Sequence, residues 1–291
     1  MSVLLIDSAG DLWSDEFKQL GVKCIDMPYS YGGNEYRYDL SKDNDLTNFY
    51  KAVRGGEVPK TMALNPQDYM QILQPVFEAG EDALYVSFSH KMSGTFDHLN
   101  TAIAALSESY PERKCTVFDT KSVCLGAGIQ MDYAAELKSN GATDEEIVAA
   151  LSDFTNKVAM YFVVNDLMHL KRGGRLVGFA AFAGTLLNLK PILTTDEHGG
   201  LTVIAKKTGK KAAMHVLADK VAKELTGTEF AVYVVDADCP EDGDALAEQI
   251  ATLRHDAKVK RLAIGPIVAS HCGPGTVGVI FVADKRTIEI K

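Results

Sequence analysis

The segment SHKMSGTF, residues 89–96, places Ser93, Gly94 and a threonine where a strand-like run ends and a helix-like run begins. The preceding ALYVSFS is apolar and rich in residues that favour strands, and apolar residues recur at helical spacing from Phe96 to Leu106. Hydroxyl and backbone N–H groups at the start of a helix can bind an anion. From these residues alone, Ser93 could be an anion ligand, a catalytic nucleophile or a helix cap.

A serine nucleophile needs a base and an orienting acid within reach, and the α/β hydrolases place it in a G-x-S-x-G turn. Ser93 instead follows a methionine and is followed directly by Gly94, so this motif is absent. The pattern favours a helix cap or an anion-binding cradle built from Ser93, the Gly94 N–H and Thr95. A serine hydrolase that uses Ser93 with His271 as its base is the alternative.

Polar residues also follow other strand-like segments. Asp7 and Ser8 end the first of them, and in FDTKSVCLGAG, residues 118–128, Asp119 ends a strand and Ser122 is predicted to begin a helix. In a parallel sheet the carboxyl ends of the strands share one edge, where ligands bind. Capping explains each residue alone, and their shared edge favours a functional role for this part of the sheet.

Two further candidates lie outside the predicted helices and strands. Thr61 precedes Asn65 and Pro66, which are typical of an N-cap and of the first position of a helix, and its own role is open from the local sequence. His271 lies in ASHCGPG after a strand-like segment, in a predicted glycine-rich loop where the backbone can approach a ligand closely. A neutral or cationic imidazole in such a loop can pair with an anion.

The segment HLKRGGR, residues 169–175, groups Lys171, Arg172 and Arg175 around a pair of glycines. These cations could bind a phosphate, so a small phosphate- or anion-binding enzyme is a second alternative. Cations near the negative end of a helix that stops at a glycine are the commoner explanation. The phosphate-binding G-x-x-x-x-G-K-[ST] loop and the dinucleotide-binding G-x-G-x-x-G motif are both absent, and we expect no cofactor.

The composition is typical of a soluble globular protein, since 46% of the 291 residues are hydrophobic and 24% are charged. The net charge of −9 argues against a nucleic-acid-binding protein, which usually has a basic face. The longest uncharged stretch, between Arg175 and Lys190, is too short to cross a bilayer, so we expect no stable membrane insertion. The N-terminal MSVLLIDS is predicted to be a strand and not a signal peptide. Five scattered cysteines without a C-x-x-C pair indicate reduced thiols in the cytoplasm and no structural metal site.

Strand-like and helix-like segments alternate along the first half of the chain. Strands are predicted at residues 2–8, 22–30, 83–89 and 114–120, and helices at 43–54, 66–79, 96–107 and 122–140. Such alternation predicts a parallel sheet covered by helices on both faces. Later segments predict a strand at 158–164, a hairpin around Gly199–Gly200, a helix at 209–225, a strand at 229–237 and a helix at 241–254. We therefore predict an α/β protein of two domains, a Rossmann-like parallel-sheet domain at 1–157 and an α/β domain with a mixed sheet at 158–291.

Six segments taken together resemble the DegV family, in the family's order and along essentially the whole chain. They are PKT at 59–61, SHKMSGTF at 89–96, FDTKSVCLGAG at 118–128, LMHLKRGGR at 167–175, LLNLKPIL at 186–193 and IGPIVASHCGPGTVGVIF at 264–281. Members of this family are bacterial fatty-acid-binding proteins, and some are the binding subunit of a fatty acid kinase. The resemblance implies a long-chain fatty acid as ligand, a fatty acid kinase catalytic subunit as a possible partner, and no catalytic residue in this chain.

The resemblance also implies where the fatty acid lies, at and between the two domains. Its carboxylate would be bound by Thr61, by Ser93 with Gly94 behind it, and by His271. A carboxylate that is removed from water needs such replacement hydrogen bonds. The acyl tail would be held in an apolar tunnel, at roughly 0.8 kcal/mol per buried methylene.

The apolar segment 176–189, with Phe179 and Phe182, is predicted to be helical and is a candidate for the tunnel wall, although core packing explains these residues equally well. The chain departs from the family pattern at two places. After Thr61 it reads MALNP where the family usually has Ser–Gln–Pro–Ser or a similar sequence. Lys207 stands where many members have an arginine implicated in kinase docking, and lysine keeps the charge but lacks the planar guanidinium.

Overall fold

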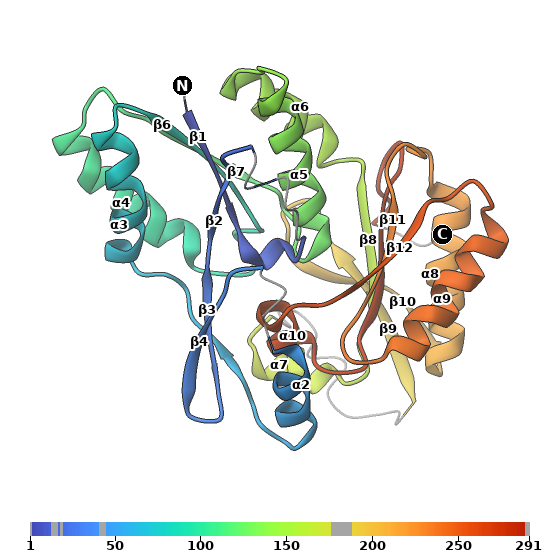
Figure 1. The fold of residues 1–291 in the computed structure, drawn as a ribbon. Helices are drawn as coiled ribbons and strands as arrows, with labels where there is room; N and C mark the ends of the chain where they lie inside the picture. The colour runs from blue at the N-terminus through green and yellow to red at the C-terminus, as the bar shows by residue number, and fades with distance from the viewer. Residues whose placement is uncertain (1, 13–16, 18–19, 41–44, 176–187, 289–291) are drawn as a thin grey trace. The chain divides into compact units, whose positions relative to one another are not determined.

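The computed structural model describes residues 2–12, 17, 20–40, 45–175 and 188–288. These residues form two compact units (Figure 1), the first within 1–44 and 61–155 and the second within 45–60 and 156–291. Each unit is built from a sheet with helices packed on it, as expected for an α/β protein. The domains predicted at 1–157 and 158–291 stay a prediction, and the two units differ from them in assigning residues 45–60 to the second unit.

The first unit is built on a parallel sheet of strand order β2–β1–β6–β7. The strands are β1 (Ser2–Asp7), β2 (Lys23–Ile25), β6 (Asp82–Ser87) and β7 (Cys115–Asp119). Helices α3 (Pro66–Glu78) and α4 (Thr95–Ser109) pack together on one face, and α5 (Leu125–Ser139) and α6 (Asp144–Phe154) pack together on the other (Figure 1). The predicted parallel sheet with helices on both faces is confirmed.

Local sequence accounts for the positions of these elements. Residues 83–87 of β6 are all buried, as expected for the continuous apolar run of a central parallel strand. Helix α3 begins with a capping box of Asn65 and Asp68, and α6 begins with one of Thr143 and Glu146. The N-cap that the sequence predicts at Asn65 is therefore confirmed, and Thr143 caps α6 in the same way.

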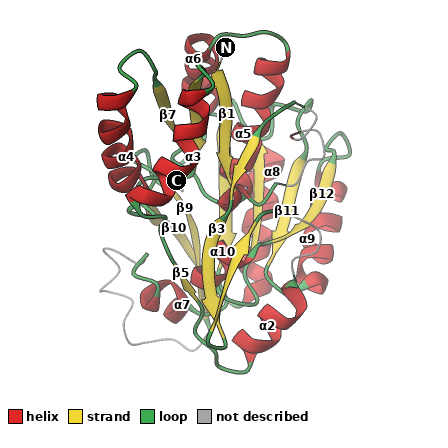
Figure 2. Ribbon diagram, turned by 60° about the vertical axis from the view of Figure 1, so that its left-hand side comes forward, coloured by secondary structure: helices red, strands yellow, loops and turns green. Residues whose placement is uncertain are grey.

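The segment 22–30 forms two strands, not the single strand that was predicted. The Met27 N–H donates to Ser8 Oγ at 3.0 Å, so the chain leaves β2 and continues as β3 (Met27–Tyr31). β3 lies between β4 (Asn34–Tyr38) and β5 (Lys60–Thr61) in a second, three-stranded sheet (Figure 2). The hairpin from β3 to β4 turns at Gly32 and Gly33, which both have positive φ, as a two-residue hairpin turn requires.

The second unit is built on a six-stranded sheet of order β10–β9–β8–β13–β11–β12. The strands are β8 (Val158–Val163), β9 (Leu189–Thr195), β10 (Leu201–Thr208), β11 (Val232–Asp236), β12 (Val259–Ala263) and β13 (Val277–Val282). Neighbouring strands are antiparallel except β11 and β12, which are parallel. The predicted mixed sheet is confirmed, and so is the predicted hairpin, which joins β9 to β10.

Helices α8 (Lys210–Glu224) and α9 (Pro240–Leu253) lie side by side on the sheet of the second unit (Figure 1) and enclose its apolar core. Three shorter helices of this unit are α2 (Leu46–Arg54), α7 (Leu167–Arg172) and α10 (Pro266–Cys272). Tyr50 holds α2 in the unit, because its buried hydroxyl donates to the Ile264 carbonyl at 2.6 Å, and Arg54 pairs with Asp238. These contacts explain why residues 45–60 belong to the second unit.

The predicted apolar helix with Phe179 and Phe182 lies outside the described residues. The described chain resumes at residue 188, and β9 begins at Leu189. The end of the predicted helix at 176–189 is therefore wrong, since its last residue already belongs to a strand.

Candidate ligand-binding site

One edge of the parallel sheet collects the polar residues that the sequence singles out. β1, β6 and β7 run in the same direction, so Asp7, Ser87 and Asp119 end at one edge. The shared edge predicted for Asp7 and Asp119 is confirmed. The segment 88–94, which joins β6 to α4 and contains Ser93, starts at this edge, between the ends of β1 and β7.

Asp7 is fully buried and ties the end of β1 to the end of β6. Its carboxylate accepts hydrogen bonds from the Phe88 N–H at 3.0 Å, the Ala9 N–H at 3.1 Å and the Tyr85 hydroxyl at 3.2 Å. Burial raises the pKa of Asp7 to about 6, although these hydrogen bonds favour the charged form. Asp7 therefore fixes the first residue of the segment 88–94 from inside the unit.

Residues at the end of β7 and directly after it also hold the segment 88–94. The Ser89 N–H donates to the Ser122 carbonyl at 2.8 Å, and His90 Nδ1 lies 2.5 Å from Asp119 Oδ2. The other oxygen of Asp119 accepts from the Lys121 N–H at 2.9 Å. Strand ends on both sides therefore position the chain that leads to Ser93.

Ser122 does not begin a helix, so this prediction is wrong. Lys121 and Cys124 have φ values of 50° and 52°, which lie outside the right-handed helical region, and α5 starts only at Leu125. The residues before α5 instead run along the end of β6, where the Thr120 N–H donates to the Ser87 carbonyl at 3.0 Å.

Ser93 and Gly94 directly precede α4, as predicted. The Thr95 N–H donates to Ser93 Oγ at 3.3 Å, and the Ser93 and Thr95 hydroxyls lie 2.9 Å apart. Gly94 is the N-cap, is exposed, and has open space where a Cβ atom would lie. A serine hydroxyl has one donor and two acceptor positions, so Ser93 can cap Thr95 and still donate to a ligand.

Thr61 is half-buried at the end of β5, next to a hydrogen bond of 3.1 Å from the Met62 N–H to the Pro28 carbonyl. The segment that follows it is tied to α4 by His98, whose Nδ1 lies 2.7 Å from the Leu64 carbonyl oxygen. His98 lies in the first turns of the helix that Ser93 and Gly94 precede. The structure therefore places the Thr61 segment and the start of α4 as connected parts of the first unit.

His271 lies in the second unit and in a helix, so its predicted position in a loop is wrong. Gly265 and Pro266 form the N-cap and first position of α10, and Gly273, with a φ of 74°, ends the helix directly after Cys272. Burial lowers the pKa of His271 to about 4, and the charge of Arg175 contributes in the same direction. Burial and Arg175 therefore favour the neutral imidazole at neutral pH when no anion is bound.

The histidines of α7 and α10 each pack against a glycine at the end of the other helix. A Cβ atom on Gly173, which ends α7, would lie within 3.0 Å of His271 Nδ1. A Cβ atom on Gly273, which ends α10, would likewise lie within 3.0 Å of the His169 ring. Real Cβ atoms almost never come so close, so both positions require glycine and the two rings are held by packing.

The basic segment 169–175 matches the expectation for a helix C-terminus. Gly173 is the C-cap of α7, and Lys171 and Arg172 are exposed in the last turn. Arg172 lies 4.0 Å from Asp166 at the start of the same helix, and the Arg175 guanidinium donates to the Gly173 carbonyl. These contacts favour helix termination over a phosphate grip.

The four predicted ligand residues thus come from both units. Thr61, Ser93 and Gly94 belong to the first unit and His271 to the second, and their common action on one ligand stays a prediction. Two histidines that the sequence does not predict as site residues help to position Thr61, Ser93 and Gly94. His90 ties the segment before Ser93 to the end of β7, and His98 ties α4 to the segment that follows Thr61.

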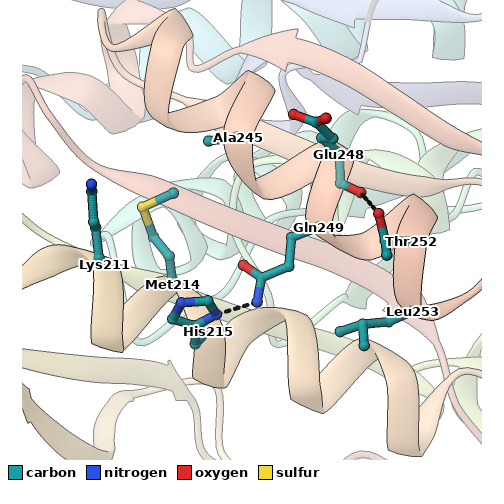
Figure 3. Close-up of a pocket in the computed structure, with 8 residues that line it drawn as sticks. All are labelled: Lys211, Met214, His215, Ala245, Glu248, Gln249, Thr252 and Leu253. Carbon is teal, nitrogen blue, oxygen red and sulfur yellow. Dashed lines mark hydrogen bonds between the residues drawn. The ribbon is translucent and has the colours of Figure 1, made fainter.

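A surface groove with a volume of about 430 Å³ lies between α8 and α9 (Figure 3). Its walls come from both helices, and Gln249 donates to the His215 ring across it. The lining residues are Lys211, Met214, His215, Ala245, Glu248, Gln249, Thr252 and Leu253. None of the four predicted ligand residues belongs to this groove.

Within the described ranges, no three His, Cys, Asp or Glu side chains are grouped in a way that could hold a metal ion. No helix of the described chain combines the length and apolar character needed to cross a bilayer.

Comparison with known proteins identifies the family. The profile described as "Uncharacterised protein, DegV family" matches residues 2–284. A DegV domain-containing protein of Clostridium perfringens is 33% identical over 288 residues, covering 98% of each chain.

Two solved structures share the fold along almost the whole chain. A DegV family protein from Thermus thermophilus is 29% identical with a TM-score of 0.82, covering 97% of this chain and 99% of that one. DegV of Bacillus subtilis is 25% identical with a TM-score of 0.80, covering 97% and 98%. Both are described as binding fatty acids. From the match along nearly its full length, this chain belongs to the DegV family.

Proposed function

We propose that this protein binds a long-chain fatty acid and performs no chemistry of its own. The observation that carries the proposal is the 29% identity, over 97% of the chain, to a Thermus thermophilus protein described as fatty-acid-binding. In this proposal Thr61, Ser93, the Gly94 N–H and His271 bind the carboxylate. The acyl tail is buried in an apolar tunnel.

The start of α4 supports a negative charge near Ser93 and Gly94. The first N–H groups of this 15-residue helix form the positive end of its dipole. Gly94 leaves open space where a Cβ atom would lie, and Ser93 can donate a hydrogen bond while it accepts one from Thr95. A carboxylate is a suitable ligand for this combination of groups.

His271 supports a binding mode that uses neutral donors. Its pKa is about 4 without a ligand, so the imidazole is uncharged at neutral pH before the fatty acid binds and offers a single N–H donor, and a bound carboxylate would raise this pKa. Most of the affinity must then come from the tail, for which about 15 methylenes give a gross ~12 kcal/mol before ordering and association costs are subtracted. The polar residues mainly fix the orientation of the carboxylate.

The same contacts give little support to a serine hydrolase. Ser93 Oγ hydrogen-bonds with the Thr95 N–H and the Thr95 hydroxyl, and among the contacts of the described residues it has no histidine partner that could act as a base. A base with a pKa of about 4, such as His271, removes a serine proton poorly near neutral pH. Labelling of Ser93 by a fluorophosphonate probe would revive the hydrolase alternative.

We further propose that the bound fatty acid is presented to the catalytic subunit of a fatty acid kinase in a bacterial cytoplasm. The exposed Lys207 in β10 keeps the positive charge of the arginine that many DegV proteins have at this position. Loaded protein should yield an acyl phosphate when the kinase subunit and ATP are added. A lack of product would reject the kinase role and leave fatty-acid binding intact.

Native mass spectrometry of protein purified from bacterial cells tests the binding function directly. We expect an adduct with the mass of a long-chain fatty acid, and roughly tenfold weaker binding after Ser93→Ala, since a hydrogen bond to a charged group is lost. Ser107→Ala is the matched control, because this exposed hydroxyl on α4 donates only to the Ile103 carbonyl, at 2.8 Å. Wild-type protein that takes up no fatty acid, or a Ser93→Ala variant that binds as the wild type does, would contradict the proposal.

A further inference from the structure

We propose that His90 and Asp119 form a positioning pair, which holds the segment 88–94 in the conformation that binds a carboxylate. This inference rests on the proposed fatty-acid function and assigns the pair no contact with the ligand. It explains how a segment that connects a strand to a helix presents Ser93 and Gly94 in one fixed orientation.

The backbone of the segment is anchored at its beginning by two hydrogen bonds. The Phe88 N–H donates to the buried carboxylate of Asp7 at 3.0 Å, and the Ser89 N–H donates to the Ser122 carbonyl at 2.8 Å. A local turn follows, in which the Met92 N–H donates to the Ser89 carbonyl at 3.0 Å. These bonds fix the first two residues of the segment and close the turn.

His90 supplies a further contact, between the end of β7 and the start of α4. Its Nδ1 lies 2.5 Å from Asp119 Oδ2, and its backbone N–H lies 3.4 Å from Asp119 Oδ1. The imidazole ring also meets the Phe96 ring edge to face, with 5.9 Å between the ring centroids. Phe96 is in the first turn of α4. The contacts of His90 with Asp119 and Phe96 therefore connect the end of β7 to the start of α4, which Ser93 and Gly94 precede.

Asp119 is itself held in place, which lets it act as a fixed acceptor. It accepts from the Lys121 N–H at 2.9 Å, and its side chain is 18% exposed, compared with 38% for His90. A hydrogen bond between a carboxylate and a partly exposed ring contributes modestly to holding the segment 88–94 in place. We therefore expect the affinity for fatty acid to fall about threefold to tenfold when this bond is removed.

The test compares the binding of hexadecanoic acid to purified, delipidated full-length variants. His90→Ala removes the donor, and Asp119→Asn removes the charge of the acceptor. His90→Asn restores a nitrogen donor close to the position of Nδ1, so it should recover most of the affinity that His90→Ala loses. Asp82→Asn is the matched control, because Asp82 accepts the Lys114 N–H at 2.9 Å at the opposite end of the same pair of strands.

Hexadecanol, which has the same tail without the carboxylate, distinguishes positioning from general stability. We expect His90→Ala and Asp119→Asn to bind hexadecanoic acid more weakly than the wild type and to bind hexadecanol as the wild type does. His90→Asn should recover most of the affinity for the acid. Unchanged affinity for the acid in both variants would overturn the inference, and so would a loss that His90→Asn fails to recover. If wild-type protein binds no hexadecanoic acid, the proposed function itself fails, which is a different result from either.

Discussion

The two regions that supply the proposed ligand contacts are positioned by different forces. In the first unit, Ser93 and Gly94 follow a segment held by hydrogen bonds from neighbouring strand ends, with Asp7 and Asp119 as acceptors. In the second unit, the His271 ring is held by close packing against Gly173. One region depends on charge and donor geometry, and the other depends on the absence of a side chain.

This difference predicts which changes each region tolerates. A hydrogen bond can be restored by a similar donor in the same place, as long as its distance and angle stay within the usual range. A ring packed on a glycine has no such tolerance, since a single added methyl group overlaps it. The second region should therefore respond most to volume, and the first to charge.

The largest effect is expected for Gly173→Ala. Gly173 has a φ of −72°, which alanine adopts without strain, so any loss must come from the overlap with His271. We expect the free energy of unfolding in urea to fall by about 3 kcal/mol, and the affinity for fatty acid to fall more than tenfold, because the displaced ring no longer reaches the ligand.

Gly55→Ala is the control for this experiment. Gly55 also ends a helix of the second unit with a φ of −72°, but a Cβ atom there would meet its nearest neighbour, the Ala52 carbonyl oxygen, at 3.2 Å. The double variant Gly173→Ala with His271→Ala should regain part of the lost stability. Wild-type stability of Gly173→Ala would show that His271 is not confined by packing.

The next effect is a pair of opposite pH dependences. The pKa of Asp7 is raised from 3.8 to about 6, so its contribution to stability is present below pH 3.8 and is lost as the pH rises through 6. The pKa of His271 is lowered from 6.5 to about 4, so its contribution is present above pH 6.5 and is lost as the pH falls through 4. Between about pH 4.5 and 6, each group changes the free energy of unfolding by about 2 kcal/mol. The two changes have opposite signs as the pH rises, so they largely cancel in the wild type.

Single variants should separate these contributions. Relative to the wild type, the unfolding free energy of His271→Asn should decrease as the pH rises over this interval, and that of Asp7→Asn should increase. Urea unfolding at a series of pH values measures both slopes. His255→Asn, at an exposed histidine, should follow the wild type, and parallel profiles for all variants would show that neither buried group titrates as the structure indicates.

The comparison of the two regions also explains which features the sequence predicts. The position of Ser93 and Gly94 follows from a strand-like run and a helical period, which are local patterns, and the structure agrees with it. Helix α10 has only seven residues, too few to show a period, so His271 was expected in a loop. The neutral state of its imidazole depends on burial and on Arg175, which lies 96 positions earlier in the chain.

Contacts between distant residues account for the remaining differences. His90 and Asp119 are 29 positions apart, and Tyr50 and Ile264, which hold α2 in the second unit, are 214 positions apart. No local pattern contains these pairings, because they form only when the sheets are assembled. The break between β2 and β3 has the same origin, since the Met27 N–H donates to Ser8, which directly follows β1.

The smallest effect on the fold, and the sharpest contrast with Gly173, is expected for Gly94→Ala. Gly94 has a φ of −71° and no neighbour within 4 Å of a Cβ atom, so alanine meets no overlap there and should lower the unfolding free energy by no more than about 1 kcal/mol, from the preference for glycine over alanine at an N-cap. Its methyl group would nevertheless occupy open space next to the start of α4, where we place the carboxylate. A threefold to tenfold loss of affinity for hexadecanoic acid, with a much smaller loss of stability than in Gly173→Ala, is therefore expected for this variant. Unchanged affinity would mean that this open space is ordinary solvent, and that Gly94 serves only as the N-cap of the helix.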